Sequence, residues 1–265
     1  MDGSKVVLLT GASAGIGRET ALEYAKLGYR LAITGRNRGR LEEVVQCMVC
    51  VSPSKSASDF LALTADFEDP KQVEPLVELT VSQFGRLDVL INNAGYPGRK
   101  LAIEDEGFFK DFTNIIQVNL MAATRLAQLA IPHLVKSRGV IVNVSSIADR
   151  IGMPSVSYSV SKAGLSMLTK TLANAMDGNQ VRVVTVSPGP VLTNFADDIE
   201  RLAPAIGLHR VGSSLEVANV IVFATSDKAS FIHGSAIDVD GGCNAKFGGL
   251  FARLKEEEPA GRQSS

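Results

Sequence analysis

The sequence predicts an α/β fold in which a parallel sheet is covered by helices on both faces. Short apolar runs rich in Val, Ile and Leu alternate along the chain with amphipathic stretches of helical period. Most of these runs are continuously apolar, which is typical of strands buried on both faces. Right-handed crossovers then give a doubly wound, Rossmann-type sheet of about seven strands.

The boundaries of the elements follow from the same pattern. Strands are expected at Val6–Thr10, Arg30–Thr34, Phe60–Thr64, Leu87–Asn92, Val140–Val144, Val181–Val186 and Ala236–Val239. Helices are expected at Gly17–Leu27, Arg38–Val49, Pro70–Phe84, about Gly107–Arg138 in two parts separated around residues 112–118, and Tyr158–Ala175. Gly28 suits the left-handed position that follows the first helix.

Composition limits the domain count and the kind of partner. No linker divides the chain, so one domain is expected over residues 1–254, followed by a polar tail, 255–265. Lys and Arg number 27 and Asp and Glu 28, which gives no electrostatic reason for a nucleic acid or an anionic membrane. A small-molecule substrate is therefore expected. No secretory or membrane-spanning segment is recognised.

Cysteines and histidines carry no metal motif. The 3 cysteines favour a reducing compartment such as the cytoplasm over a disulfide framework. Cys47 and Cys50 form a CxxC, but no second pair accompanies it, so two buried or half-buried thiols near a helix end are expected. No metal site is predicted.

A glycine-rich turn follows the first strand, with the sequence Thr10-Gly-Ala-Ser-Ala-Gly-Ile-Gly17. Glycines allow a tight turn and close approach of the backbone to phosphates, while the helix N-terminus offers N–H donors. The spacing is GxxxGxG rather than GxGxxG, and the alternative is an ordinary strand-to-helix connection. A dinucleotide site is predicted at this loop, which includes Gly11, Ser13, Gly15, Ile16 and Gly17.

The end of the second strand bears on the choice of cofactor. A carboxylate there would bind the ribose 2′-hydroxyl of NAD. The sequence instead places Arg36 there, with no acidic residue before Glu42. A guanidinium can meet the 2′-phosphate of NADP with charge-assisted hydrogen bonds. NADP is therefore predicted, against the alternative that the local arginines only solvate a helix start.

Tyr158 and Lys162 stand four residues apart on a predicted helix and share one face. A tyrosine ionises near pKa ~10, and a nearby ammonium lowers that pKa. The pair is a candidate acid/base, although YxxxK can also be an exposed helix face. Other polar segments fall at carboxyl ends of strands, where ligands bind in such sheets: Asn143–Ser146, Asn92–Gly95 and Pro188–Thr193.

Together these motifs resemble the short-chain dehydrogenase/reductase family. The matching segments are TGASAGIG, Asp66, NNAG, Asn119, VSS, YSVSK, PGPVLT and Val239-Asp240-Gly241-Gly242. They occur in order and span about residues 5–243, which makes the resemblance far more specific than any single motif.

The resemblance implies roles for these residues. Tyr158 would donate the proton in reduction, Lys162 would lower its pKa and bind ribose, and Ser146 would orient the carbonyl. Asn119 would help hold a water for proton relay. Cofactor contacts would come from Asp66 to the adenine, from Asn93, Ala94 and Gly95, and from Pro188, Gly189, Val191 and Thr193 near the nicotinamide. The family also implies a homodimer or homotetramer, with Phe247–Phe251 a possible contact.

Two departures from the family pattern leave choices open. The serine usually lies thirteen residues before the tyrosine, which selects Ser145, whereas the strand-end pattern selects Ser146. Ser146 is preferred because loops change length more readily than strand registers flip. Ala14 stands where many NADP-preferring relatives carry a basic residue, so the preference for NADP depends on Arg36.

The predicted function is NADP(H)-dependent interconversion of a carbonyl and a secondary alcohol. The alternatives are an isomerase or dehalogenase on the same scaffold, or a non-catalytic NADP-sensing or scaffolding protein. Each of these could lose the Ser-Tyr-Lys set, which is retained here. Substrate choice is assigned to residues 194–212 and 148–157, whose apolar side chains indicate either an apolar substrate or ordinary lid packing.

Overall fold

A computed structural model describes residues 5–52, 56–99, 101–153, 155–193 and 199–246. The described residues form a seven-stranded, all-parallel sheet in the order β3-β2-β1-β4-β5-β6-β9. The doubly wound fold is therefore confirmed. The strands are β1 (Val6–Leu9), β2 (Arg30–Gly35), β3 (Phe60–Thr64), β4 (Val89–Asn92), β5 (Val140–Val144), β6 (Arg182–Pro188) and β9 (Ala236–Val239). A separate parallel pair joins β7 (Val191–Leu192) to β8 (Gly212–Ser213).

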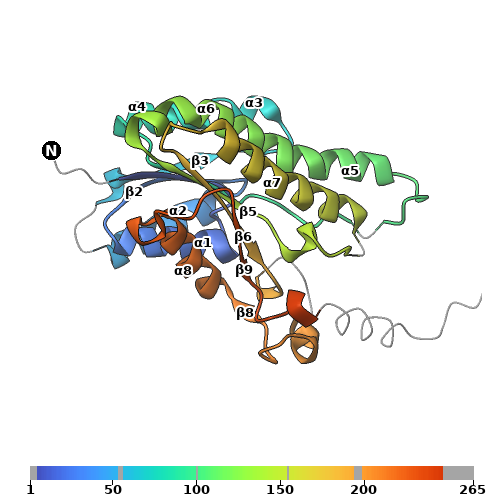
Figure 1. Ribbon diagram of the computed structural model, residues 1–265. Coiled ribbons are helices and arrows are strands. Elements are labelled where there is room, and N and C mark those ends of the chain that lie inside the picture. Colours follow the sequence, from blue (N-terminus) through green and yellow to red (C-terminus); the bar gives the residue numbers. More distant parts are fainter. Residues whose placement is uncertain (1–4, 53–55, 100, 154, 194–198, 247–265) are drawn as a thin grey trace, which may run out of the picture.

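Helices cover both faces of the sheet (Figure 1). One face carries α1 (Gly15–Lys26), α2 (Arg38–Val51) and α8 (Ser214–Thr225). The other carries α3 (Pro70–Val73), α4 (Leu76–Phe84), α5 (Phe108–Ile116), α6 (Ala122–Ser137) and α7 (Val156–Ala175). Side chains of a strand alternate between the faces, so Val7 and Leu9 enter one apolar core and Val6 and Leu8 the other. Short helices occur at η1 (Ala57–Asp59), η3 (Ile147–Asp149), η4 (Ile199–Ala205), η5 (Asp227–Ala229) and η6 (Asn244–Lys246).

The helix predicted over Pro70–Phe84 is divided in two. Asp69 caps α3 by accepting a hydrogen bond from Lys71 N. Pro75 stands at the N-cap of α4 and has no N–H with which to continue the first segment. The prediction of one continuous helix was wrong because it gave too little weight to this proline.

The helix predicted over Gly107–Arg138 is continuous through its middle. A π-helical segment, η2 (Gln117–Met121), joins α5 to α6, and the N–H of Ala122 bonds to the carbonyl of Gln117. A π-helix accommodates extra residues without ending the helix. Asn119 lies within this segment, where it is 1% exposed.

Helix α8 was not predicted. It begins with a capping box, in which the Ser213 hydroxyl accepts from Glu216 N and the Glu216 carboxylate accepts from Ser213 N. The sequence pattern S-x-x-E before an apolar run is the signal that could have located it. The prediction therefore left the crossover from β6 to β9 without a helix.

The order of the strands reverses between β1 and β4. The chain moves from β1 toward one edge of the sheet and returns through β4 toward the other. In open α/β sheets, ligands bind beside the carboxyl ends of the strands at such a reversal. No helix in the described part of the chain is long and apolar enough to cross a membrane. Residues 247–265 lie outside the described residues, so the expected domain boundary, tail and contact at Phe247–Phe251 stay predictions.

Candidate active site

The glycine-rich turn lies directly against the end of β4. Gly11 has φ +67°, and a Cβ on it would lie 2.8 Å from Ala94 Cα. A Cβ on Gly17 would lie 2.2 Å from the carbonyl oxygen of Gly11. Both contacts are with backbone atoms, so side chains at these two positions would displace the turn. Ser13 borders the end of β2, because a Cβ on Gly35 would lie 3.3 Å from Ser13 Oγ.

Hydrogen bonds from Thr10 and Asn93 fix this turn. The buried Thr10 hydroxyl accepts from the N–H groups of Asn93 and Ala94, both at 2.9 Å, and donates to the Ile91 carbonyl at 3.2 Å. In return, Asn93 Nδ2 donates to the carbonyls of Thr10 at 2.9 Å and Gly11 at 3.1 Å. The loops that follow β1 and β4 therefore form one unit.

The N-terminus of α1 has the features of an anion site. Its N-cap, Ala14, makes no side-chain capping hydrogen bond, and the first turn carries no acidic residue. Uncapped N–H groups at a helix start can bind phosphate oxygens. Thr193 lies next to this turn, since a Cβ on Gly15 would be 3.2 Å from Thr193 Cγ2. Ile16 packs its half-buried side chain against the core.

The segment after β6 approaches the same edge. Pro188 ends β6, and Val191 is buried in β7. Gly189 contacts the loop after β9 so closely that a Cβ on it would lie 2.7 Å from Asp240 Cβ. The predicted cofactor residues of this segment thus lie at the carboxyl edge of the sheet, beside the glycine-rich turn.

The charges of Arg36 and Asp66 both act on Tyr96. Burial is the main cause that raises the pKa of Tyr96; the charges of Glu68 and Asp66 raise it further and that of Arg36 lowers it. Arg36 is exposed, and no described residue forms an ion pair with it. The nearby Arg38 is instead paired with Glu42 at 2.8 Å. Arg36 is therefore available to an anion at the end of β2.

The catalytic candidates converge where β5 ends. Ser146 is the N-cap of η3, and its hydroxyl accepts from Ala148 N at 3.2 Å and hydrogen-bonds to Tyr158. Ser145 points elsewhere, with its hydroxyl 3.0 Å from the carbonyl of Lys162. Of the two serines, Ser146 is the one beside the tyrosine. Ser155 caps α7 by accepting from Tyr158 N at 3.3 Å.

Desolvation by the surrounding protein has the largest effect on the pKa of the half-buried Tyr158. Desolvation raises its pKa to about 12, the hydrogen bond from Ser146 lowers it, and the charge of Asp149 raises it. This net direction is opposite to the lowering expected from Lys162, because burial removes more hydration from the phenolate than its neighbours restore. Tyr158 is therefore protonated at neutral pH.

Lys162, Asn119 and Gly95 lie next to one another in the site. Lys162 is 3% exposed, its Nζ donates to the Val144 carbonyl at 2.8 Å, and burial lowers its pKa to about 8, while the charge of Asp149 raises it. Its Nζ lies 5.7 Å from the centroid of the Tyr158 ring. A Cβ on Gly95 would lie 3.4 Å from Lys162 Nζ and 3.1 Å from Asn119 Oδ1.

Asn119 holds the backbone that follows the NNAG segment. Its Oδ1 accepts from Tyr96 N and its Nδ2 donates to Tyr96 O, both at 3.1 Å, and Nδ2 also lies 3.0 Å from Ser161 Oγ. The side-chain amide of Asn119 is thus occupied by protein groups. Both N–H groups of the amide are used, whereas Oδ1 retains one lone pair, so the water expected beside Asn119 stays a prediction.

Sequence reasoning missed Asp149, a carboxylate whose side chain is 2% exposed and whose charge acts on both Tyr158 and Lys162. It also missed Tyr96. No spacing rule marks an acidic residue in a short loop as buried; the one available signal was its position five residues after a strand end.

The segments assigned to substrate choice pack on each other. Ile147, Ile151, Ala205, Ile206 and Cys243 form a small buried apolar cluster. Residues 194–198 lie outside the described residues, so this part of the segment assigned to substrate choice stays a prediction. Cys47 is half-buried and Cys50 is exposed, which corrects the expectation that both are at least half-buried.

The chain belongs to the short-chain dehydrogenase/reductase family and is an oxidoreductase. Residues 11–244 match the family described as enoyl-(acyl carrier protein) reductase. The resemblance read from the motifs is thereby confirmed over most of the chain.

Individual relatives have similar lengths. The 3-oxoacyl-[acyl-carrier-protein] reductase FabG of Staphylococcus aureus is 34% identical over 246 residues, covering 90% of this chain and 98% of the relative. A crystal structure of a short-chain dehydrogenase/reductase of unknown function from Caenorhabditis elegans, with cofactor, has a TM-score of 0.83 at 33% identity and covers 91% of this chain and 95% of that one. Acetoin dehydrogenase YohF from Salmonella typhimurium has a TM-score of 0.79 at 28% identity, covering 91% and 97%.

Proposed function

We propose that this protein is an NADP(H)-dependent reductase that interconverts a carbonyl and a secondary alcohol, with Tyr158 as the acid/base. The observation that carries the proposal is the contact between Ser146 and a half-buried, protonated Tyr158 at the carboxyl end of β5, with Lys162 behind it. The relatives are consistent with it, since the FabG enzymes are named as 3-oxoacyl reductases and YohF as an acetoin dehydrogenase.

The residues at the edge of the sheet fit a dinucleotide. The cradle made by Gly11 and Gly17 has no room for a Cβ, and the start of α1 has no side-chain cap. In this proposal the turn and Thr193 hold the phosphates, Arg36 the 2′-phosphate and Asp66 the adenine, while Lys162 holds the nicotinamide ribose. When bound, NADPH supplies the hydride that reduces the carbonyl carbon.

The protein manages the proton and the position of the substrate. In reduction, the hydroxyl of Ser146 hydrogen-bonds to the substrate carbonyl oxygen, and Tyr158 donates its proton to that oxygen as the alcohol forms. In the reverse direction the Tyr158 phenolate accepts the proton. The ammonium charge of Lys162 supports this phenolate before the proton is transferred, because opposite charges stabilise each other strongly at a buried site.

A panel of carbonyl substrates, assayed with NADPH and NADH in parallel, tests this function. We expect turnover with a marked preference for NADPH. Arg36→Gln should weaken this preference about tenfold or more, since charge-assisted hydrogen bonds contribute roughly 1.5–3 kcal/mol. Arg38→Gln is the matched control, because Arg38 already pairs with Glu42, and it should leave the preference unchanged.

Two results would contradict the proposal. A preference for NADH would overturn the role of Arg36. Tight NADPH binding without turnover of any carbonyl would favour the sensing or scaffolding alternative.

The proposal includes a homodimer or homotetramer in the cytoplasm. Large apolar side chains exposed on α5 and α7, among them Phe109, Val160 and Met167, support self-association. Free thiols at Cys47, Cys50 and Cys243 are consistent with a reducing compartment. Size-exclusion chromatography with light scattering tests the assembly, and a monomer at micromolar concentration would contradict it.

A further inference from the structure

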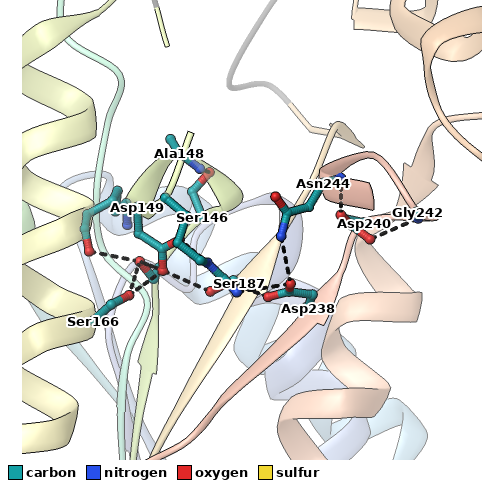
Figure 2. Close-up of polar contacts among 12 residues, drawn as sticks. Ser146, Ala148, Asp149, Ser166, Ser187, Asp238, Asp240, Gly242 and Asn244 are labelled. Atoms are coloured by element: carbon teal, nitrogen blue, oxygen red, sulfur yellow. Dashed lines mark hydrogen bonds and ion pairs between the residues drawn. The ribbon is translucent and has the colours of Figure 1, made fainter. Parts of the chain in front are cut away.

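A buried carboxylate, Asp149, lies close to Ser146 and is surrounded by hydroxyl groups (Figure 2). Asp149 ends η3, three residues after Ser146, and its side chain is 2% exposed. Its Oδ2 accepts hydrogen bonds from the hydroxyls of Ser166 on α7 and Ser187 on β6, the latter at 3.3 Å. Its Oδ1 accepts from Arg150 Nε at 2.7 Å. The negative charge is therefore buried but well supplied with donors.

Ser145 connects this carboxylate to the backbone of the catalytic helix. Its Oγ lies 3.4 Å from Asp149 Oδ2, 2.9 Å from Ser166 Oγ and 3.0 Å from the carbonyl oxygen of Lys162. A hydroxyl has one proton, so these contacts form a shared network rather than three full bonds to the carboxylate. The turn that carries Ser146 is thus attached to α7 one turn from Tyr158.

The neighbouring positive charges do not fully neutralise the carboxylate of Asp149. Arg150 is 40% exposed in its side chain and divides its guanidinium between Asp149 and a two-pronged contact with Asp238 on β9. From α7, Lys162 and Tyr158 face the same region, and the charge of Asp149 raises the pKa of both. On α5, which also packs against α7, Asp111 is paired with Arg99.

We propose that Asp149 is a positioning residue for the reductase, a role that rests on the function proposed above. Its charge acts together with desolvation to favour the protonated, donating form of the Tyr158 hydroxyl, and its hydrogen bonds keep Ser146 directed at that hydroxyl. The carboxylate thereby favours carbonyl reduction, which needs the proton on Tyr158, over alcohol oxidation at the same pH.

The pH profile of Asp149→Asn tests this role. Asparagine retains the shape and can still accept from Ser166 and Ser187, but it lacks the charge. Reduction falls at alkaline pH as Tyr158 loses its proton. In Asp149→Asn we expect this decline about one pH unit lower than in the wild type, the size typical of one close charge. Asp238→Asn is the matched control: it removes a carboxylate from the outer part of the network and should leave the decline in place.

A second variant, expected to shift the alkaline decline in the opposite direction, distinguishes an electrostatic effect from simple damage to the fold. Arg150→Gln removes the cation that partly neutralises Asp149, so the decline should move to higher pH. If Asp149→Asn lowered kcat equally at every pH, or if Arg150→Gln moved the decline to lower pH, the positioning role would be overturned and Asp149 would have a structural role only.

A second readout does not depend on turnover. In NMR spectra of isotope-labelled lysine, with the Lys162 signal assigned by Lys162→Met, we expect Lys162 to titrate near pH 8 in the wild type and at lower pH in Asp149→Asn. An unchanged titration would overturn the electrostatic role even in active enzyme. A downward shift in protein that reduces no carbonyl would leave Asp149 acting on Lys162 and would contradict the proposed function instead.

Discussion

Removing the hydroxyl of Thr10 is the most direct test of how the glycine-rich turn is held in place. Thr10 is 1% exposed, and its Oγ1 accepts from two backbone N–H groups at 2.9 Å. Thr10→Val has nearly the same shape but no acceptor. An orphaned buried N–H costs about 1–3 kcal/mol, so two of them should lower the free energy of unfolding by roughly 2–6 kcal/mol. At about 2–4 °C per kcal/mol for a chain of this size, Tm should fall by about 10 °C.

Chemical unfolding followed by circular dichroism, at one protein concentration, measures this loss. Thr80→Val in α4 is the matched control. Thr80 is 0% exposed, and its hydroxyl donates only to the Leu76 carbonyl at 2.7 Å, within its own helix. No donor is orphaned there, so the cost should stay below about 1 kcal/mol. Equal losses in the two variants would refute the reasoning, because the turn would then not depend on Thr10 as an acceptor.

Three further predictions concern the site. Gly17→Ala should weaken NADPH binding about tenfold or more in fluorescence titration, since the new Cβ would lie 2.2 Å from the Gly11 carbonyl oxygen; wild-type affinity would contradict the close approach. Ser155→Ala should cost about 1 kcal/mol of stability and lower kcat, because it removes the helix cap that accepts a hydrogen bond from Tyr158 N. An unchanged kcat would show that this cap does not contribute to catalysis. Burial lowers the pKa of Lys162 from 10.5 to about 8, so as the pH rises the folded protein loses the Lys162 proton at a lower pH than the unfolded chain does. The stability of wild type relative to Lys162→Met should therefore rise between pH 8 and 10.5, by at most about 1.4 kcal/mol per pH unit; parallel pH dependences would contradict the buried, charged lysine.

Apolar periodicity was sufficient to predict the sheet. Most of the seven strands are predominantly apolar runs, and their observed bounds lie within two residues of those predicted. Helix boundaries were predicted less accurately than strands. A proline can divide a helical pattern, as Pro75 does, and a π-helix can continue a helix through an expected break, as at Gln117–Met121. Helix α8 was missed although its capping box, Ser213 to Glu216, is visible in the sequence.

The site shows a similar division. Motif order brought Tyr158, Lys162, Ser146 and the glycine turn to one edge of the sheet, where the structure places them. The balance of charge at Tyr158 could not be predicted, since it depends on how deeply the ring is buried and on Asp149, which sequence spacing does not mark. Spacing identifies which groups can meet, whereas desolvation is a property of the packed molecule.

The central claim is that Tyr158 gives a proton to a carbonyl oxygen while NADPH reduces the carbon. The most direct measurement is single-turnover reduction with NADPH deuterated at the transferring position, comparing wild type with Tyr158→Phe. We expect label on the carbinol carbon in the wild type, and a rate about 10²–10⁴-fold lower in Tyr158→Phe with NADPH affinity unchanged. Equal rates in the two proteins, or a product without label, would contradict it.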